Sequence, residues 1–127
     1  MEIAPIKDSE FEASATSTSK SLSLRFWGNA DLRVNTAIGT FLDGVDREAL
    51  KLRAADVVVD FRELVFMNSS CLKEFVRWIG RVSDRDAPQQ YRIRFLRDPA
   101  AHWQSRSLQA LSVFAPRIVL VEVSDKT

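Results

Sequence analysis

Hydrophobic and polar residues along the chain follow two different periods. Residues 21–27, "SLSLRFW", place Leu22, Leu24 and Phe26 between polar neighbours, which is the period of a half-buried strand. Residues 34–52 instead repeat apolar side chains at the spacing of a helix with one buried stripe. That stripe consists of Val34, Ala37, Ile38, Phe41, Leu42, Val45 and Ala49. The pattern therefore predicts a strand followed by an amphipathic helix.

Four further segments have strand character. The loosely alternating residues 10–16 predict an edge strand that forms a hairpin with residues 21–27. Residues 55–61, "ADVVVDF", form a short apolar run, which favours a strand covered by helices on both faces or deep in a mixed sheet. Residues 90–97 alternate again, and residues 117–123 predict the last strand.

Two more helices are expected between these strands. One begins near Ser70, where a broad apolar arc is complemented by a charged outer face. The arc contains Cys71, Leu72, Phe75, Val76, Trp78, Ile79 and Val82, and the charged face contains Lys73, Glu74, Arg77 and Arg81. Asp98 as N-cap and Pro99 as first helical residue predict the other helix, which Pro116 ends.

The element order predicts an α/β fold. Two strands followed by three helix–strand units imply parallel pairs joined by right-handed crossovers. We expect a mixed, mostly parallel sheet, opened by an antiparallel hairpin and flanked by three helices. The predicted domain covers residues 10–124, after a flexible N-terminus at residues 1–9.

Composition narrows the class of protein. The 127 residues suffice for one domain, and the hydrophobic fraction of 46% and charged fraction of 28% are those of a globular protein. Lys and Arg number 18 against 17 Asp and Glu, which argues against a nucleic-acid binder. No early apolar run resembles a signal peptide, and none reaches the roughly 20 residues that span a bilayer. A single cysteine excludes an internal disulfide, so a reducing, cytoplasmic setting without membrane contact is expected.

The inventory of reactive side chains makes the case for an enzyme weak. One His and one Cys are too few for a zinc site of those ligands, and neither an HExxH nor a CxxC spacing occurs. No glycine-rich phosphate loop is present, so no cofactor is predicted. The alternative is a thiol-dependent enzyme with Cys71 near a helix N-terminus and His102 as its imidazole partner. Simple packing of Cys71 and a partly exposed helical His102 are the plainer interpretation.

The junction of residues 60–82, "DFRELVFMNSSCLKEFVRWIGRV", carries the most specific signal. Asn68, Ser69 and Ser70 join a strand to a helix, where backbone amides lack partners and the helix dipole is positive. These residues can cap the helix, accept a phosphate, or do both. We expect Ser70 to be the cap and Asn68 to orient the loop.

The run "FMNSSCL", reached from "VVVDFRELV", resembles the conserved loop of STAS domains, the anti-anti-sigma-factor family. Seven residues match its motif: Asp60, Val65, Phe66, Met67, Ser69, Ser70 and Leu72. The family's usual Asp before the serine pair is Asn68 here, and its usual Gly is Cys71. The family's element order is also the order predicted above. A branch of SiaC-like regulators similarly carries Asn before its hydroxyl residue.

The resemblance implies a non-catalytic switch in a bacterial partner-switching pathway. Its unphosphorylated form would bind an anti-sigma factor or serine kinase, phosphorylation of Ser69 would weaken that complex, and a phosphatase would reset it. The SiaC-like branch implies instead a regulator that binds and activates a cyclase. The expected partner surface contains Asn68, Ser69, Ser70, Cys71, Lys73, Glu74 and Arg77.

Two other groups of residues have alternative interpretations. A basic face for nucleotide or nucleic acid could be formed by Arg77, Arg81, Arg85, Arg92, Arg94 and Arg97. A solvated face is the plainer interpretation, because acidic residues balance the total charge. Trp27, Trp78 and Trp103 are expected in the core or at its edge, and an exposed Trp78 or Trp103 would become a candidate interface anchor.

Overall fold

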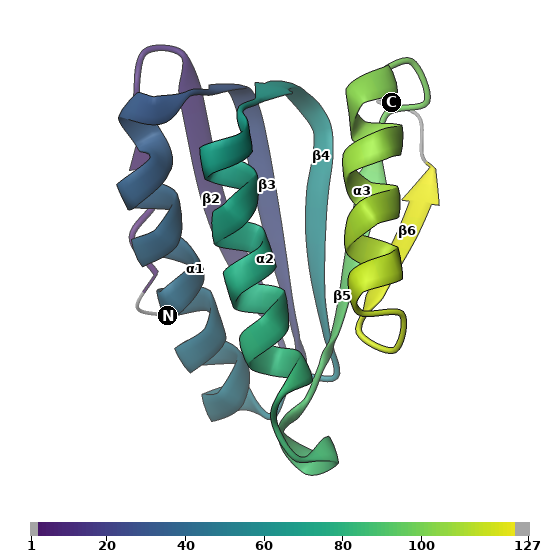
Figure 1. Ribbon diagram of the computed structural model, residues 1–127. Helices are drawn as coiled ribbons and strands as arrows, with labels where there is room; N and C mark the ends of the chain where they lie inside the picture. Colours follow the sequence, from purple (N-terminus) through teal and green to yellow (C-terminus); the bar gives the residue numbers. More distant parts are fainter. Residues whose placement is uncertain (1–2, 124–127) are drawn as a thin grey trace.

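One six-stranded sheet carries three helices in the computed structural model, which describes residues 3–123 (Figure 1). The strands lie in the sheet in their chain order, from β1 to β6. The elements are β1 (Ile6–Lys7), β2 (Phe11–Thr18), β3 (Ser21–Ala30), η1 (Leu32–Val34), α1 (Asn35–Leu52), β4 (Asp56–Met67), α2 (Ser69–Ser83), η2 (Ala87–Gln89), β5 (Arg92–Arg97), α3 (His102–Phe114) and β6 (Val119–Val123). Residue 124, the end of the predicted domain, lies outside the described residues.

The sheet is mixed, as predicted. β1 pairs antiparallel with β2 and β2 with β3, while β3, β4, β5 and β6 are parallel neighbours. The predicted α/β class, the opening hairpin and the three helices are confirmed. Within the N-terminal segment 1–9, for which flexibility is predicted, Ile6–Lys7 form β1 and Ile3 is buried against the core, while residues 1–2 lie outside the described residues.

All three helices lie on one face of the sheet (Figure 1). Along β3, residues alternate between buried Leu22, Leu24 and Phe26 and exposed polar neighbours, which is the signature of a sheet covered on one side. Of the two alternatives for residues 55–61, a strand deep in a mixed sheet is the one observed, since β4 lies between β3 and β5 and helices cover only one of its faces. Val57 and Val59 point into the core, whereas Val58 between them is only partly buried on the open face.

Several element boundaries differ from the prediction. β3 continues past Gly28 to Ala30, and β4 continues to Met67 because two register shifts against β3 absorb extra residues. The third helix begins at His102 rather than at Pro99, because Asp98 forms a turn instead of a cap. Its Oδ1 accepts the amide of Ala100 at 3.0 Å. β6 begins two residues later than expected, at Val119.

Gly28 is required where β3 passes β2. Its φ of +91° is a conformation that residues with a side chain rarely adopt. A Cβ there would also lie 2.1 Å from the carbonyl oxygen of Glu10. The close approach lets the Asn29 amide donate to the same carbonyl at 2.8 Å, which holds this end of the hairpin together.

A buried polar network joins α1 to α2 at the opposite end of the molecule from the β4–α2 junction. Trp78 Nε1 donates to the Tyr91 hydroxyl at 2.8 Å, and that hydroxyl donates to Asp46 Oδ1 at 2.6 Å. Arg85 Nη1 donates to the same carboxylate at 2.8 Å. Burial opposes ionisation of Asp46, but the hydrogen bonds from Arg85 and Tyr91 and the charges of Arg85 and Arg81 outweigh it and lower its pKa.

Replacing Tyr91 by Phe should therefore leave Asp46 short of a buried donor. We expect Tyr91→Phe to lower the free energy of unfolding by about 1–3 kcal/mol at neutral pH, measured by urea denaturation. Because the pKa of Asp46 is lowered in the fold, its contribution is complete above the ordinary aspartate value of about 4 and is lost as pH falls through the folded value. Asp46→Asn should remove that part of the acid dependence. Equal stability of Tyr91→Phe and the wild-type protein would contradict a structural role for the network.

Candidate functional site

The β4–α2 junction lies at the carboxyl end of the central strands (Figure 1). The amide of Asn68 donates to the carbonyl of Ala30 at 2.9 Å, so the junction is fixed to the end of β3. Asn68 has extended backbone angles, and its Oδ1 accepts the amide of Cys71 at 2.9 Å. Asn68 is thus the N-cap of α2, and the prediction that Ser70 is the cap is wrong. An amide oxygen caps without bringing a charge to the junction.

Ser69 is exposed and is the first residue of α2. Because Asn68 provides the cap, the Ser69 hydroxyl is not needed to satisfy the helix end. Ser70 is half-buried, and its carbonyl accepts Nδ2 of Asn35 at 2.8 Å. That bond ties the start of α1 to the first turn of α2, so Ser70 belongs to the framework and Ser69 faces solvent.

Cys71 is fully buried, at 0% exposure, so it is not available on the partner surface where the sequence placed it. Its Sγ lies 3.3 Å from the carbonyl oxygen of Asp31. Burial, together with the charges of Asp31 and Glu74, raises the pKa of the Cys71 thiol to about 11. A thiol in that environment stays protonated at neutral pH and is a weak nucleophile.

The proposed pairing of Cys71 with His102 is not present. The sulfur of Cys71 contacts the backbone carbonyl of Asp31, whereas His102 is exposed at the start of α3. His102 lines a shallow hollow of about 330 Å³ together with residues from the end of β4 and the β5–α3 loop, and Cys71 does not line it. Within residues 3–123, no group of three or more His, Cys, Asp or Glu side chains is arranged to hold a metal ion.

Lys73 and Arg77 are exposed on α2 and follow Ser69 at intervals of four residues. These three residues form one solvent-facing stripe of the helix. Glu74 is instead largely covered, with 13% of its side chain exposed, and its Oε1 lies 3.5 Å from Arg77 Nη1. It packs beside Gly39 of α1, where any Cβ would lie 2.7 Å from Oε1. Five of the predicted partner residues are therefore accessible to different degrees at this end, while Cys71 and most of Glu74 are not.

Exposed apolar side chains surround the junction. Leu32 in η1, Val65 and Phe66 at the end of β4 are 69%, 65% and 47% exposed. They lie at the same end because Asn29 is the register partner of Phe66 and Ala30 that of Met67. We name Leu32, Val65, Phe66 and Ser69 the junction surface. Val65 and Phe66 belong to the motif that pointed to this site, but nothing in the sequence pattern indicated Leu32.

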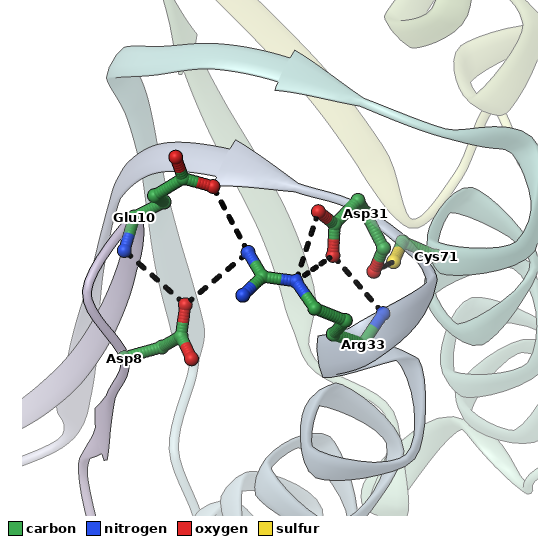
Figure 2. Close-up of polar contacts among 5 residues, drawn as sticks. All are labelled: Asp8, Glu10, Asp31, Arg33 and Cys71. Atoms are coloured by element: carbon green, nitrogen blue, oxygen red, sulfur yellow. Dashed lines mark hydrogen bonds and ion pairs between the residues drawn. The ribbon is translucent and has the colours of Figure 1, made fainter.

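A charged cluster borders the junction surface (Figure 2). Arg33 Nη2 lies 3.0 Å from Glu10 Oε2 and 3.5 Å from Asp8 Oδ2, while its Nε lies 3.2 Å from Asp31 Oδ2. Three carboxylates thus share one guanidinium, which points toward β2 and away from Cys71. The pKa of Arg33 is raised, first by its hydrogen bond to Asp31 and then by the charges of Asp31 and Asp8. Sequence reasoning missed the cluster because its members are brought together by the β2–β3 hairpin.

Gln104 holds α3 against the end of β4. It is fully buried, and its Nε2 donates to the carbonyls of Phe61 at 2.7 Å and Leu64 at 2.9 Å. Its Oε1 accepts the amide of Asp98 at 3.0 Å. Phe61 lies within the first register shift of β4 and Leu64 just after it, so Gln104 supplies donors where the strand is irregular. No sequence pattern pointed to this residue.

The arginines do not form a continuous basic face. Arg77, Arg81 and Arg85 lie on or just after α2, whereas Arg92 and Arg94 project from the opposite, open face of the sheet. Carboxylates pair with four of the six predicted residues: Arg77 with Glu74, Arg81 with Asp43, Arg85 with Asp46 and Arg94 with Glu122. Trp78 is buried as expected, Trp103 is partly buried, and Trp27 is 43% exposed on the open face, so its placement in the core is wrong.

Asn68→Ala should test the cap directly. Loss of the amide oxygen leaves the Cys71 amide without its partner, so we expect a loss of about 1 kcal/mol in the free energy of unfolding. Ser70→Ala is the matched control and should change stability by only a few tenths of that amount. Urea denaturation of both variants gives the comparison, and a larger loss for Ser70→Ala would restore Ser70 as the cap.

The thiol of Cys71 should react slowly in the native protein. Burial and a pKa near 11 together predict little labelling by a thiol reagent at pH 7 and rapid labelling once the protein is unfolded in urea. Mass spectrometry follows both reactions. Rapid stoichiometric labelling of the folded protein would revive the thiol-enzyme alternative.

Known proteins resemble this chain in structure and not in sequence. No protein-family model matches the chain, and no curated protein matches it in sequence. Its structure is similar to the crystal structure of an anti-sigma factor antagonist from Mycobacterium paratuberculosis. The TM-score is 0.64 at 12% sequence identity, and the match covers 88% of this chain and 85% of that chain. The chain therefore has a STAS-like fold, which it shares with that protein.

Proposed function

We propose that this chain is a non-catalytic regulator that binds a protein partner through the junction surface and is released by phosphorylation of Ser69. The observation that carries the proposal is an exposed serine at the first position of α2 among exposed apolar side chains. The similarity to an anti-sigma factor antagonist favours an anti-sigma factor or a related serine kinase as the partner. A phosphatase would restore the binding form.

The apolar part of the junction surface supplies a reason to bind. Leu32, Val65 and Phe66 are each about half or more exposed and lie at one end of the sheet. Clustered exposed apolar side chains beside polar residues are typical of protein interaction sites. A partner that covers them gains hydrophobic stabilisation and also covers Ser69, which is next to them in the fold.

The fold can carry a phosphate at Ser69. A phosphate adds about −1.5 to −2 charge, and the N-terminus of a helix favours an anion. Lys73 lies one turn further along the same exposed stripe, where a cation can pair with the phosphate. Asn68 remains the cap because its oxygen, not that of Ser69, accepts the Cys71 amide. Phosphorylation therefore leaves the domain folded.

The same phosphate opposes a docked partner. An apolar interface around Ser69 would have to remove water from a doubly charged group, and every 1.4 kcal/mol of that cost weakens binding tenfold. The neighbouring carboxylates of Asp8, Glu10 and Asp31 outnumber the single guanidinium of Arg33, so this border offers the phosphate no spare cation. Modification thus changes affinity without changing the fold.

The experiment compares variants of Ser69 that differ in charge alone. A partner is first identified by co-purification with the tagged chain from its own cells, and its affinity is then measured for the wild-type protein, Ser69→Asn and Ser69→Asp. We expect Ser69→Asn to bind within about threefold of wild type and Ser69→Asp to bind at least about tenfold more weakly. Incubation with the partner kinase and ATP should place phosphate on Ser69, as located by mass spectrometry.

Two controls keep the result interpretable. Thermal unfolding should show that Ser69→Asp is folded, because an aspartate is favourable at a helix N-terminus. Phe66→Lys should weaken binding, whereas Val113→Lys, at an exposed valine of α3, should not. A Ser69→Asp protein that binds as tightly as wild type would rule out the charge switch. Capture of a cyclase in place of a kinase would favour the SiaC-like alternative.

A further inference from the structure

The two edges of the sheet differ in how they are protected from other strands. At one edge, β1 has only two residues and follows Pro5, and Lys7 is exposed on it. Short strands, proline and lysine are the usual protection of a sheet edge. At the other edge, β6 has five residues, "VLVEV", which contain no proline, glycine or lysine and pair in unbroken register with β5 (Figure 1).

The main chain of β6 presents free hydrogen-bonding groups at this edge. The Ile93 amide donates to the Ile118 carbonyl at 2.8 Å, which sets the alternation of the parallel ladder. Leu120 and Glu122 therefore direct their main-chain groups toward β5, and Val119, Val121 and Val123 direct theirs away. The Val119 amide is used by the Ala115 carbonyl at 2.9 Å. Within residues 3–123, the outward groups without a strand partner include the amides of Val121 and Val123 and the carbonyls of Val119 and Val121.

The side chains of β6 do not repel an approaching strand. Val123 is 58% exposed, and Val121 is partly buried against the core on the same face. The one charged residue, Glu122, accepts hydrogen bonds from Arg94 at 2.8 and 3.1 Å. This pair lowers the pKa of Glu122, first through the hydrogen bond and also through the charge of Arg94. The carboxylate is thus compensated within its own chain.

We propose that β6 is a self-association site, where two copies of the chain pair antiparallel about a two-fold axis at Val121. Each Val121 amide donates to the Val121 carbonyl of the other copy. Each Val123 amide donates to the Val119 carbonyl of the other copy. A complete ladder would also have each Val119 amide donate to the Val123 carbonyl of the other copy, but that amide is held by the Ala115 carbonyl. The pairing therefore forms the other four of its six main-chain hydrogen bonds. The two six-stranded sheets become one continuous sheet.

The side chains of β6 are complementary to those of a second β6, which favours another copy of the chain as the partner of this edge. On the helix-covered face, Val119 lies opposite Val123 of the other copy, and the two Val121 side chains meet at the axis. On the open face, Leu120 lies opposite Glu122, so the two carboxylates are not opposed. Registers that place Glu122 opposite Glu122 bring like charges together and are disfavoured. The strand is therefore complementary to itself in one register.

This site is independent of the proposed switch. β6 is separated by β5 from β4, the strand that leads to Ser69, so pairing through β6 leaves the junction surface open (Figure 1). The dimer would present two junction surfaces to partners. Failure of the Ser69 experiment leaves this proposal standing, and failure of this proposal leaves the switch standing.

Sedimentation velocity of the purified full chain, from low-micromolar to near-millimolar concentration, tests self-association. We expect the mass to rise with concentration to twice the 14.4 kDa of one chain. Val123→Lys places a cation on the paired edge and should raise the dimer dissociation constant about tenfold or more. Leu50→Lys is the control, since Leu50 is also an exposed apolar residue but lies on α1, and it should leave the constant unchanged. A protein that stays monomeric throughout, or an unaffected Val123→Lys, overturns the proposal.

Cysteine cross-linking tests the register. Leu120→Cys and Glu122→Cys chains, mixed under oxidising conditions, should form a disulfide-linked dimer, because these positions are opposite one another in the proposed pairing. Each variant alone should cross-link at least about tenfold more slowly, since its cysteines lie two pairs apart along the ladder. The native Cys71 is buried and does not contribute. Equal cross-linking of Leu120→Cys alone would overturn the Val121-centred register.

Discussion

Contact among four phenylalanines fixes helix α2 on the central strands of this domain. Phe26 of β3, Phe61 of β4 and Phe75 of α2 lie with ring centroids 5.4–5.5 Å apart, and Phe95 of β5 lies 5.3 Å from Phe61. Their near-perpendicular or tilted arrangement is the favourable geometry for buried aromatic rings. Because Phe75 lies in α2, the cluster holds that helix against the three central strands and thereby sets where its first turn emerges.

Helices cover only one face of the sheet, and this explains where the apolar and the charged side chains lie. Core side chains are concentrated between the sheet and the three helices, whereas the open face carries ion pairs such as Asp60 with Arg62 and Arg94 with Glu122. On the open face, burial opposes ionisation of Asp60, but its bonds to Arg62 outweigh that effect and lower its pKa. The junction surface lies at the carboxyl ends of β3 and β4, beyond both the core and the ion pairs of the open face. No helix in the described part of the chain is long and apolar enough to cross a membrane.

At the β4–α2 junction, helix capping and an accessible hydroxyl belong to neighbouring residues. A helix start needs an acceptor for its amides, and a regulatory serine must be free to react. Asn68 performs the first task, so the second is open to Ser69. Cys71 is buried in the core, and the exposed stripe of α2 is left to Ser69, Lys73 and Arg77. Asn68 and Cys71 thus act at the cap and in the core, and Ser69 between them in the chain stays accessible.

The sequence by itself determined the element order, the sheet type and the strand–helix junction, because hydrophobic period depends on local geometry alone. It could not determine that Asn68 caps α2 in place of Ser70, since both are good caps and the choice rests on where β4 ends. Nor could the sequence predict the start of α3. The helix begins at His102 rather than at Pro99, because the buried Gln104 side chain accepts the Asp98 amide and holds the preceding residues in a turn. Leu32 and the Arg33 cluster lie beside the junction only because β3 pairs with both β2 and β4. Such contacts join residues distant in the chain, and only tertiary structure decides which of them form.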